Sequence, residues 1–228
     1  MKQEPQRFGR FMLLERLAVG GMAELYRAEL TGPYGFAKTV AIKKILPAFN
    51  LRPRFRKMFL RESRIMAALN HGNLVQVYEL GEVDGDLFMC LEFVDGCDLS
   101  ALCKRLAVLN KRLPVWLAVW IVREVARGLS YLHGLKDDKG VPLEIVHRDV
   151  NPHNILLSNQ GDVKLGDFGI AKGLSDELQT QQGQIKGKLE YLSPEQAKGD
   201  VLGPASDLYA LGLVLFELLC GQRYLQGA

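Results

Sequence analysis

The stretch from Ile145 to Gly169, IVHRDVNPHNILLSNQGDVKLGDFG, decides how the rest of the chain is interpreted. It contains two short apolar runs, residues 155–157 and 163–165, on either side of the turn Ser158-Asn159-Gln160-Gly161. Two strand-like runs around an Asn/Gly turn are typical of a β-hairpin. The sequence therefore predicts a hairpin within this stretch.

Three oxygen-bearing side chains flank the predicted hairpin. Asp149 and Asn154 come just before its first strand, and Asp167 comes just after its second. We therefore expect the three side chains to converge at one end of the hairpin. Such ligands, in company with phosphate oxygens, suit a hard cation such as Mg²⁺.

Composition narrows the class of protein. The 228 residues are 48% hydrophobic, enough for one large or two small domains, and a net charge of +3 is too small to indicate nucleic-acid binding. The basic cluster Arg52–Arg64 is either a solvated helix face, which we favour, or a phosphate or partner site. The four cysteines lack C-x₂-C spacing, which argues against a metal site and favours a reducing compartment.

Targeting signals are not evident in the sequence. The N-terminus has no apolar signal-peptide core, and the longest apolar run, Leu208–Leu215, is too short to cross a bilayer. We therefore expect a cytoplasmic protein without a membrane segment.

The first part of the chain reads as a small β-sheet. Residues 11–46 predict three strands in meander order, and two more strands are expected around Asp84-Gly85. The first turn contains Gly20 and Gly21, which form either an ordinary turn or a loop whose backbone N–H groups approach a phosphate.

A charged pair is expected inside this β-rich part. Lys43 lies on the third strand among apolar neighbours, where a cation needs a partner or a phosphate. Helical spacing over residues 51–69 puts Glu62 on or near the apolar face. Glu62 is therefore either the partner of Lys43 or an exposed residue of an Arg-rich helix.

From Asp95 onward the sequence becomes helical. Asp98 or Ser100 is expected to cap a short helix, and Pro114 to begin a long one. Apolar residues repeat at intervals of three and four, which predicts a buried face with both tryptophans in the core: Trp116, Leu117, Trp120, Ile121, Val125, Leu129 and Leu132. A further apolar helix is expected over residues 205–220. The predicted domains are 1–94, which is β-rich, and 95–228, which is mostly helical.

Residues from Phe8 to about Gly221 resemble the catalytic domain of bacterial Ser/Thr protein kinases, with HRD-x₄-N and DFG as the central signature. The resemblance implies an α+β, bilobal protein-kinase-like fold, in which an N-terminal antiparallel-sheet lobe with one helix precedes a mostly helical lobe. It also implies Mg·ATP-dependent phosphoryl transfer to Ser or Thr hydroxyls of protein substrates in bacterial signal transduction, with ATP and Mg²⁺ as cofactors.

The resemblance assigns roles to individual residues. Asp149 matches the catalytic Asp that accepts the proton of the substrate hydroxyl, and Asn154 and Asp167 match the Mg²⁺ ligands. Lys43 matches the lysine that holds the α- and β-phosphates, with Glu62 as its partner. The remaining positions implied to contact the phosphates or the adenine are Gly20, Gly21, Leu25, Ala41, Leu91, Glu92, Val94 and Leu156.

Several further matches are structural or regulatory. Asp207 is implied to brace the backbone of the catalytic loop, Glu195 to pair with a late Arg, and His147 to be structural rather than a base. Arg148 matches an Arg that often pairs with a phosphorylated activation loop, and Thr180 is the candidate phosphosite.

Some positions depart from the family pattern. Ala18 and Ala23 replace two glycines of the phosphate loop. Asn151 stands where Ser/Thr kinases usually have a Lys that touches the γ-phosphate, and Lys188 stands where a Thr is usual. We hypothesise that Lys188 restores the missing cation from the opposite side of the site.

The chain ends at Ala228, whereas the family's helical lobe continues after the helix that contains Asp207. The sequence is therefore interpreted as apparently truncated, either a fragment or a naturally shortened kinase. Part of the apolar surface of residues 208–219 is then expected to be exposed and to be covered by self-association or by a partner.

The motifs are compatible with three functional classes. An active Ser/Thr kinase is favoured because Lys43, Glu62, Asp149, Asn154 and Asp167 are all present. The alternative is a catalytically weak or inactive kinase-like module that binds nucleotide or a partner protein. A small-molecule phosphotransferase is disfavoured by the Ser193-Pro194-Glu195 element and the loop before it.

Overall fold

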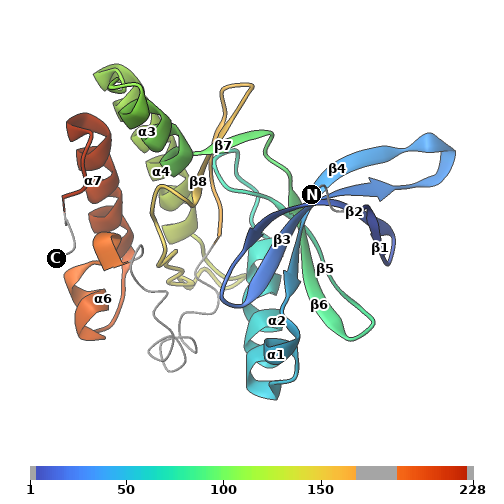
Figure 1. Ribbon diagram of the computed structural model, residues 1–228. Helices are drawn as coiled ribbons and strands as arrows, with labels where there is room; N and C mark the ends of the chain where they lie inside the picture. The colour runs from blue at the N-terminus through green and yellow to red at the C-terminus, as the bar shows by residue number, and fades with distance from the viewer. Residues whose placement is uncertain (1–3, 168–188, 225–228) are drawn as a thin grey trace. The chain divides into compact units, whose positions relative to one another are not determined.

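The computed structural model describes residues 4–167 and 189–224, and the chain separates into two compact units. The first unit comprises Met1–Asn70 and Gln76–Phe93, and the second comprises His71–Val75 and Val94–Ala228. Figure 1 labels most of the helices and strands of both units. Their composition agrees with the expected α+β fold, a sheet-rich part followed by a mostly helical part.

The segment His71–Val75 belongs to the second unit, although the predicted division at residue 94 assigned it to the first. Backbone hydrogen bonds explain its place: Val75 N donates to Leu165 O at 3.0 Å, and Leu165 N donates to Asn73 O at 2.8 Å. The Asn73 side chain also donates to Glu124 Oε2 at 3.1 Å. These partners are distant in sequence, so no local pattern indicates that His71–Val75 belongs to the second unit.

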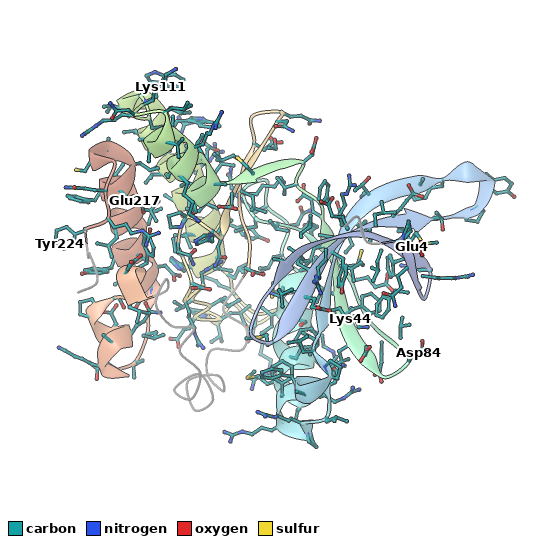
Figure 2. All side chains as sticks on the ribbon, in the orientation of Figure 1. Glu4, Lys44, Asp84, Lys111, Glu217 and Tyr224 are labelled. Carbon is teal, nitrogen blue, oxygen red and sulfur yellow. The ribbon has the colours of Figure 1, made fainter. Side chains whose placement is uncertain are left out.

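The first unit is built on a six-stranded antiparallel sheet with the order β1-β2-β3-β4-β6-β5 (Figure 1). Its strands are β1 Gln6–Phe8, β2 Phe11–Val19, β3 Ala23–Thr31, β4 Ala37–Ile45, β5 Val77–Val83 and β6 Asp86–Glu92. The expected meander and the expected last two strands are confirmed, whereas β1 was not predicted. Asp84 and Gly85, with φ values of 51° and 86°, form the two-residue turn of the β5–β6 hairpin, at whose tip Figure 2 labels Asp84.

Side chains alternate between the two faces of this sheet. One face forms a closed hydrophobic cluster of Phe8, Phe11, Leu13, Tyr26, Ala28, Val40, Ile42, Phe88 and Cys90. The Phe88 ring packs edge-on against Phe8 and Phe11, with ring centroids 5.4 and 5.3 Å apart. The opposite face of the same central strands also carries buried side chains, among them Ala41, Met89 and Leu91.

The first unit also contains the 3-10 turn η1, Pro33–Gly35, and two α-helices, α1, Pro47–Asn50, and α2, Pro53–Ala67. The one-turn helix α1 precedes the single helix that was expected. Phe55, Phe59 and Met66 of α2 are buried, as expected for its apolar face, but Ile65, which was expected on the same face, is 37% exposed. An ion pair of 2.7 Å between Arg56 Nη2 and Glu82 Oε2 joins α2 to β5.

The second unit combines a small sheet with helices. Its elements are β7 Gly96–Asp98, α3 Leu99–Val108, α4 Val115–His133, β8 Ile155–Ser158, β9 Val163–Leu165, η3 Leu189–Tyr191, α6 Pro194–Lys198 and α7 Pro204–Cys220. Strands β8 and β9 pair antiparallel, which confirms the predicted hairpin, and α4 packs against α7 (Figure 1). Asp98, rather than Ser100, caps α3 by accepting the Ala101 N–H at 2.8 Å.

The prediction that both tryptophans lie in the core was wrong for Trp116, which is 70% exposed, and Trp120 is only half-buried. The fully buried stripe of α4 runs through Ala118, Ile121, Val125, Leu129 and Leu132. Trp116 lies two positions before Ala118, so its side chain is rotated from that of Ala118 by about 200° around the α-helix. Spacing of three and four fitted Trp116 as well as Ala118, so only packing could choose between them.

Part of the α7 surface is apolar and exposed, as expected from the sequence. Leu208, Tyr209 and Leu219 are 53%, 40% and 37% exposed, respectively. Other residues of the same helix, among them Leu211, Val214 and Leu218, are buried. Within the described residues, no helix has the length and hydropathy that a bilayer crossing requires.

Candidate active site

The segment before β8 is held by a buried carboxylate from α7. Asp207, 1% exposed, accepts the backbone N–H of His147 and of Arg148, each at 2.8 Å. The ring of His133 lies 2.8 Å from the same carboxylate. Arg148 has a φ of 67°, a strained conformation for a residue other than glycine, so the loop shape is imposed by these tertiary bonds. This geometry is the bracing that the resemblance implied for Asp207.

His147 is fully buried and completes the support of the loop. Its Nδ1 accepts the Asp149 N–H at 3.3 Å, while its Nε2 lies 3.1 Å from the carbonyl oxygen of Gly166. One ring nitrogen must accept and the other must donate, which requires the neutral imidazole. Burial lowers the pKa of His147, against the opposing effect of the Asp207 and Asp149 carboxylates. The neutral ring therefore connects the backbone of Asp149 to the backbone of Gly166.

Short hydrogen bonds join Asp149, Asn154 and Gly166, the residue before Asp167. Asn154 Nδ2 donates to the carbonyl oxygen of Asp149 at 2.7 Å. The N–H of Gly166, the residue before Asp167, donates to the carbonyl oxygen of Asn154 at 2.8 Å. Asp167 is exposed and has a φ of 52°. The two ends of the β8–β9 hairpin thus bring the three residues together.

These bonds also orient a set of oxygen ligands. Because Nδ2 of Asn154 is directed to Asp149, Oδ1 is the atom of that amide that could coordinate a cation. With the Asp167 carboxylate it would supply two hard oxygens, and Mg²⁺ is commonly held by so few protein ligands together with substrate phosphates. No cluster of three or more His, Cys, Asp or Glu suited to a metal occurs in the part of the chain that the structure describes.

The sequence pattern did not single out Gln196 as a residue of this site. Its side chain donates from Nε2 to the carbonyl oxygen of Arg148 at 3.0 Å and accepts the Ser193 N–H at 3.0 Å. Ser193 and Gln196 form a capping box at the start of α6. The spacing S-x-x-Q was a detectable signal for the cap, but not for the contact with the catalytic loop. Glu195, beside it, contacts the Ser206 hydroxyl.

In the first unit, strand register gathers four of the predicted nucleotide-binding residues on one face of the sheet. Leu25 pairs with Lys43 across β3 and β4, and Ala41 pairs with Leu91 across β4 and β6. Residues at i and i+2 share a face, so Ala41 and Lys43 lie side by side. This is the face opposite the closed hydrophobic cluster. Ala41 and Leu91 are buried and Lys43 is half-buried.

The other predicted binding residues lie at the ends of these elements. Gly20 and Gly21 are exposed in the β2–β3 turn, which the Gly20 N–H closes by donating to Ala23 O at 2.8 Å. Glu92 ends β6, and its N–H donates to Gln76 O at 2.8 Å. Val94 and Leu156 belong to the second unit, the latter on β8.

Some predictions fall on residues that the structure does not describe. Glu62 lies on α2, but its side chain is outside the described part of the chain, so its expected pairing with Lys43 remains a prediction. Thr180 and Lys188 are also outside the described residues.

Comparisons with known proteins agree with this geometry. Residues 14–228 match the family model of the protein kinase domain. The tyrosine-protein kinase MasK of Myxococcus xanthus is 40% identical over 218 residues, covering 96% of this chain and 34% of that protein. The serine/threonine-protein kinase PrkC of Bacillus subtilis is 37% identical over 214 residues, covering 94% of this chain and 31% of that protein. The chain thus spans about a third of the length of these relatives.

Solved structures give the same result. The crystal structure of the kinase domain of PknI from Mycobacterium tuberculosis has a TM-score of 0.71 and 30% sequence identity to this chain. The match covers 98% of this chain and 79% of that one. With a family model that matches nearly the whole sequence and a shared fold, the chain belongs to the protein kinase domain family.

Proposed function

We propose that this domain transfers the γ-phosphoryl group of Mg·ATP to the hydroxyl groups of serine or threonine in protein substrates. The observation that supports this most is the joining of Asp149, Asn154 and the Gly166-Asp167 segment by hydrogen bonds of 2.7 and 2.8 Å. A candidate base and two oxygen ligands are thereby set on one rigid loop and hairpin. Positioning of this kind carries most of the catalysis of phosphoryl transfer.

Each residue has a definite role in this proposal. Asp149 orients the acceptor hydroxyl and accepts its proton. Asn154 and Asp167 hold Mg²⁺, which supplies neutralisation of the phosphate charge when it is bound. Lys43, on the sheet face opposite the closed hydrophobic cluster, holds the α- and β-phosphates, and Glu62 orients Lys43 in turn.

The remaining predicted residues contact the rest of the nucleotide in this proposal. The phosphates lie under the backbone of Gly20 and Gly21. The adenine contacts the apolar side chains of Leu25, Ala41, Leu91 and Leu156, and backbone groups of Glu92–Val94 recognise its polar edge. The shared sheet face of Leu25, Ala41, Lys43 and Leu91 supports this assignment.

Tyrosine is a second candidate acceptor. PrkC is named a serine/threonine-protein kinase, whereas MasK, 40% identical over 96% of this chain, is named a tyrosine-protein kinase. Asn151, in place of the lysine usual in Ser/Thr kinases, leaves the acceptor side of the loop different from that pattern. We favour Ser/Thr and keep tyrosine as the acceptor to be excluded by experiment.

The test is transfer of ³²P from γ-labelled ATP to protein, with acid hydrolysis to identify the phosphorylated amino acid. We expect phosphoserine or phosphothreonine from the wild-type chain and loss of signal in Asp149→Asn. Phosphotyrosine alone would replace the favoured acceptor by the second. Absence of transfer, while Mg·ATP still raises the melting temperature, would favour a weak or inactive kinase-like module that binds nucleotide or a partner.

We place this activity in the cytoplasm as part of bacterial signalling. ATP is available there, and the cysteines Cys90, Cys97, Cys103 and Cys220 are all unpaired thiols, as expected in a reducing compartment. Self-association, or a partner that covers the exposed apolar residues of α7, is part of the same proposal.

A further inference from the structure

Asn151 has a defined place in the catalytic loop. It is 5% exposed, and its Nδ2 lies 3.0 Å from the carbonyl oxygen of Asp149 and 3.2 Å from Asp149 Oδ1. On the other side, its Oδ1 accepts the His153 N–H at 2.9 Å. The amide orientation follows from these partners, because a flipped amide would face two oxygens with an oxygen and an N–H group with an NH₂.

A lysine could not make the same set of bonds. Lysine carries no acceptor and could not receive the N–H of His153. Asn151, for its part, directs the two hydrogens of Nδ2 to two atoms of Asp149. Its side chain is thus committed within the loop, and it does not substitute for a cation at the γ-phosphate.

We propose that Asn151 is a positioning residue, which holds the carboxylate of Asp149 in the orientation required for phosphoryl transfer. The bond to Oδ1 fixes the rotation of the carboxylate, and the bond to the carbonyl oxygen fixes the backbone that carries it. Both come from one buried side chain, which is anchored at its far end by His153. The proposal rests on the proposed kinase function, in which Asp149 receives the acceptor hydroxyl.

Asn151→Asp separates this role from simple support of the loop. Aspartate keeps an acceptor for the His153 N–H, but it loses both donors to Asp149 and sets a second carboxylate beside the first. The matched control is Asn159→Asp, the same chemical change at an exposed turn position between β8 and β9. Asn151→Ala removes both the donors to Asp149 and the acceptor of the His153 N–H.

The measurements are the kcat and the KM for ATP of phosphoryl transfer by the 228-residue chain. We expect Asn151→Asp and Asn151→Ala to lower kcat roughly tenfold or more without changing the KM for ATP, because only the orientation of the proton acceptor is lost. Asn159→Asp should match the wild type. Full activity of Asn151→Asp, or a KM for ATP that changes together with kcat, would overturn the proposal.

A second measurement does not depend on catalysis. Melting temperatures of Asn151→Ala, Asp149→Ala and the double variant form a thermodynamic cycle. If the two side chains contact each other, the loss in the double variant is smaller than the sum of the two single losses. Additive losses would overturn the contact even if the wild type transfers no phosphate, an outcome that would separately reject the kinase function.

Discussion

The carboxylate of Asp207, in the first turn of α7, accepts the backbone N–H of His147 at 2.8 Å, across 60 residues of sequence. The same carboxylate accepts the N–H of Arg148, so one buried group on a helix holds two consecutive peptide units of the catalytic loop.

Asp207→Asn is expected to destabilise the protein by about 3 kcal/mol, because an amide NH₂ would face a buried N–H donor and the charge-assisted bonds would be lost. Chemical denaturation measures the change. Asp138→Asn, the same substitution at an exposed position, should stay within about 0.5 kcal/mol of the wild type. Equal effects of the two substitutions would show that Asp207 does not brace the loop.

Stability should fall on the acid side of neutrality because of His147. Burial lowers the pKa of His147 below its ordinary value of 6.5, so in that range the unfolded chain binds a proton that the folded chain does not. The stabilisation is therefore complete above pH 6.5 and is lost as the pH falls from there toward the lowered pKa. Over that interval the free energy of unfolding decreases by up to about 1.4 kcal/mol per pH unit.

Urea midpoints between pH 7.5 and 5.5 test this prediction. The slope should flatten in His147→Gln, which cannot be protonated, and persist in His153→Gln, whose side chain is 55% exposed in the native protein. An unchanged slope in His147→Gln would assign the pH dependence to other groups.

Lys43 and Lys44 are neighbours on β4 whose side chains lie on opposite faces of the sheet. Lys43→Met should reduce phosphoryl transfer roughly 100-fold or more, because a charge that stabilises the phosphates is removed. Lys44, labelled in Figure 2, forms an ion pair of 2.8 Å with Asp86 on the face of the closed hydrophobic cluster. Lys44→Met should therefore preserve transfer and cost at most about 1 kcal/mol of stability.

Rates of ³²P transfer and denaturation curves of both lysine variants test this prediction. Loss of transfer in both variants would indicate that transfer depends on the integrity of the sheet and not on the charge of Lys43.

Asp98 supports both α3 and, through it, the catalytic loop. Its Oδ1 accepts the Ala101 N–H at 2.8 Å, and the N–H of Ser100 donates to the carbonyl oxygen of Pro152 at 3.1 Å. Asp98→Ala should lower the free energy of unfolding by about 1 kcal/mol, whereas Asp98→Ser retains a capping oxygen and should lose less. Thermal or urea unfolding measures both, and identical losses would contradict a capping role.

Local patterns predicted the elements that depend on nearby residues. The β8–β9 hairpin follows from two apolar runs around Ser158–Gly161, and the β5–β6 turn follows from Asp84-Gly85. These signals are strong because turn geometry and side-chain alternation are set within a few residues. The convergence of Asp149, Asn154 and Asp167 could be predicted from the sequence for the same reason, because all three flank one hairpin.

Long-range packing decided the rest. Ile121 and Trp116 both fit the helical spacing of α4, but only contact with the rest of the second unit buries one and leaves the other 70% exposed. His71–Val75 joins that unit through backbone bonds to β9, which no periodicity in the segment indicates.

The sequence by itself determined the kinase family, through the identity and spacing of His147, Arg148, Asp149, Asn154 and Asp167. Only the tertiary structure decided how Asn151 is used. Its partners, Asp149 and His153, lie two residues away on either side, but the loop conformation that turns them toward its amide depends on Asp207 and His147. A short side chain can bridge such partners only when distant residues hold the backbone in a strained shape, and residue spacing alone does not reveal that shape.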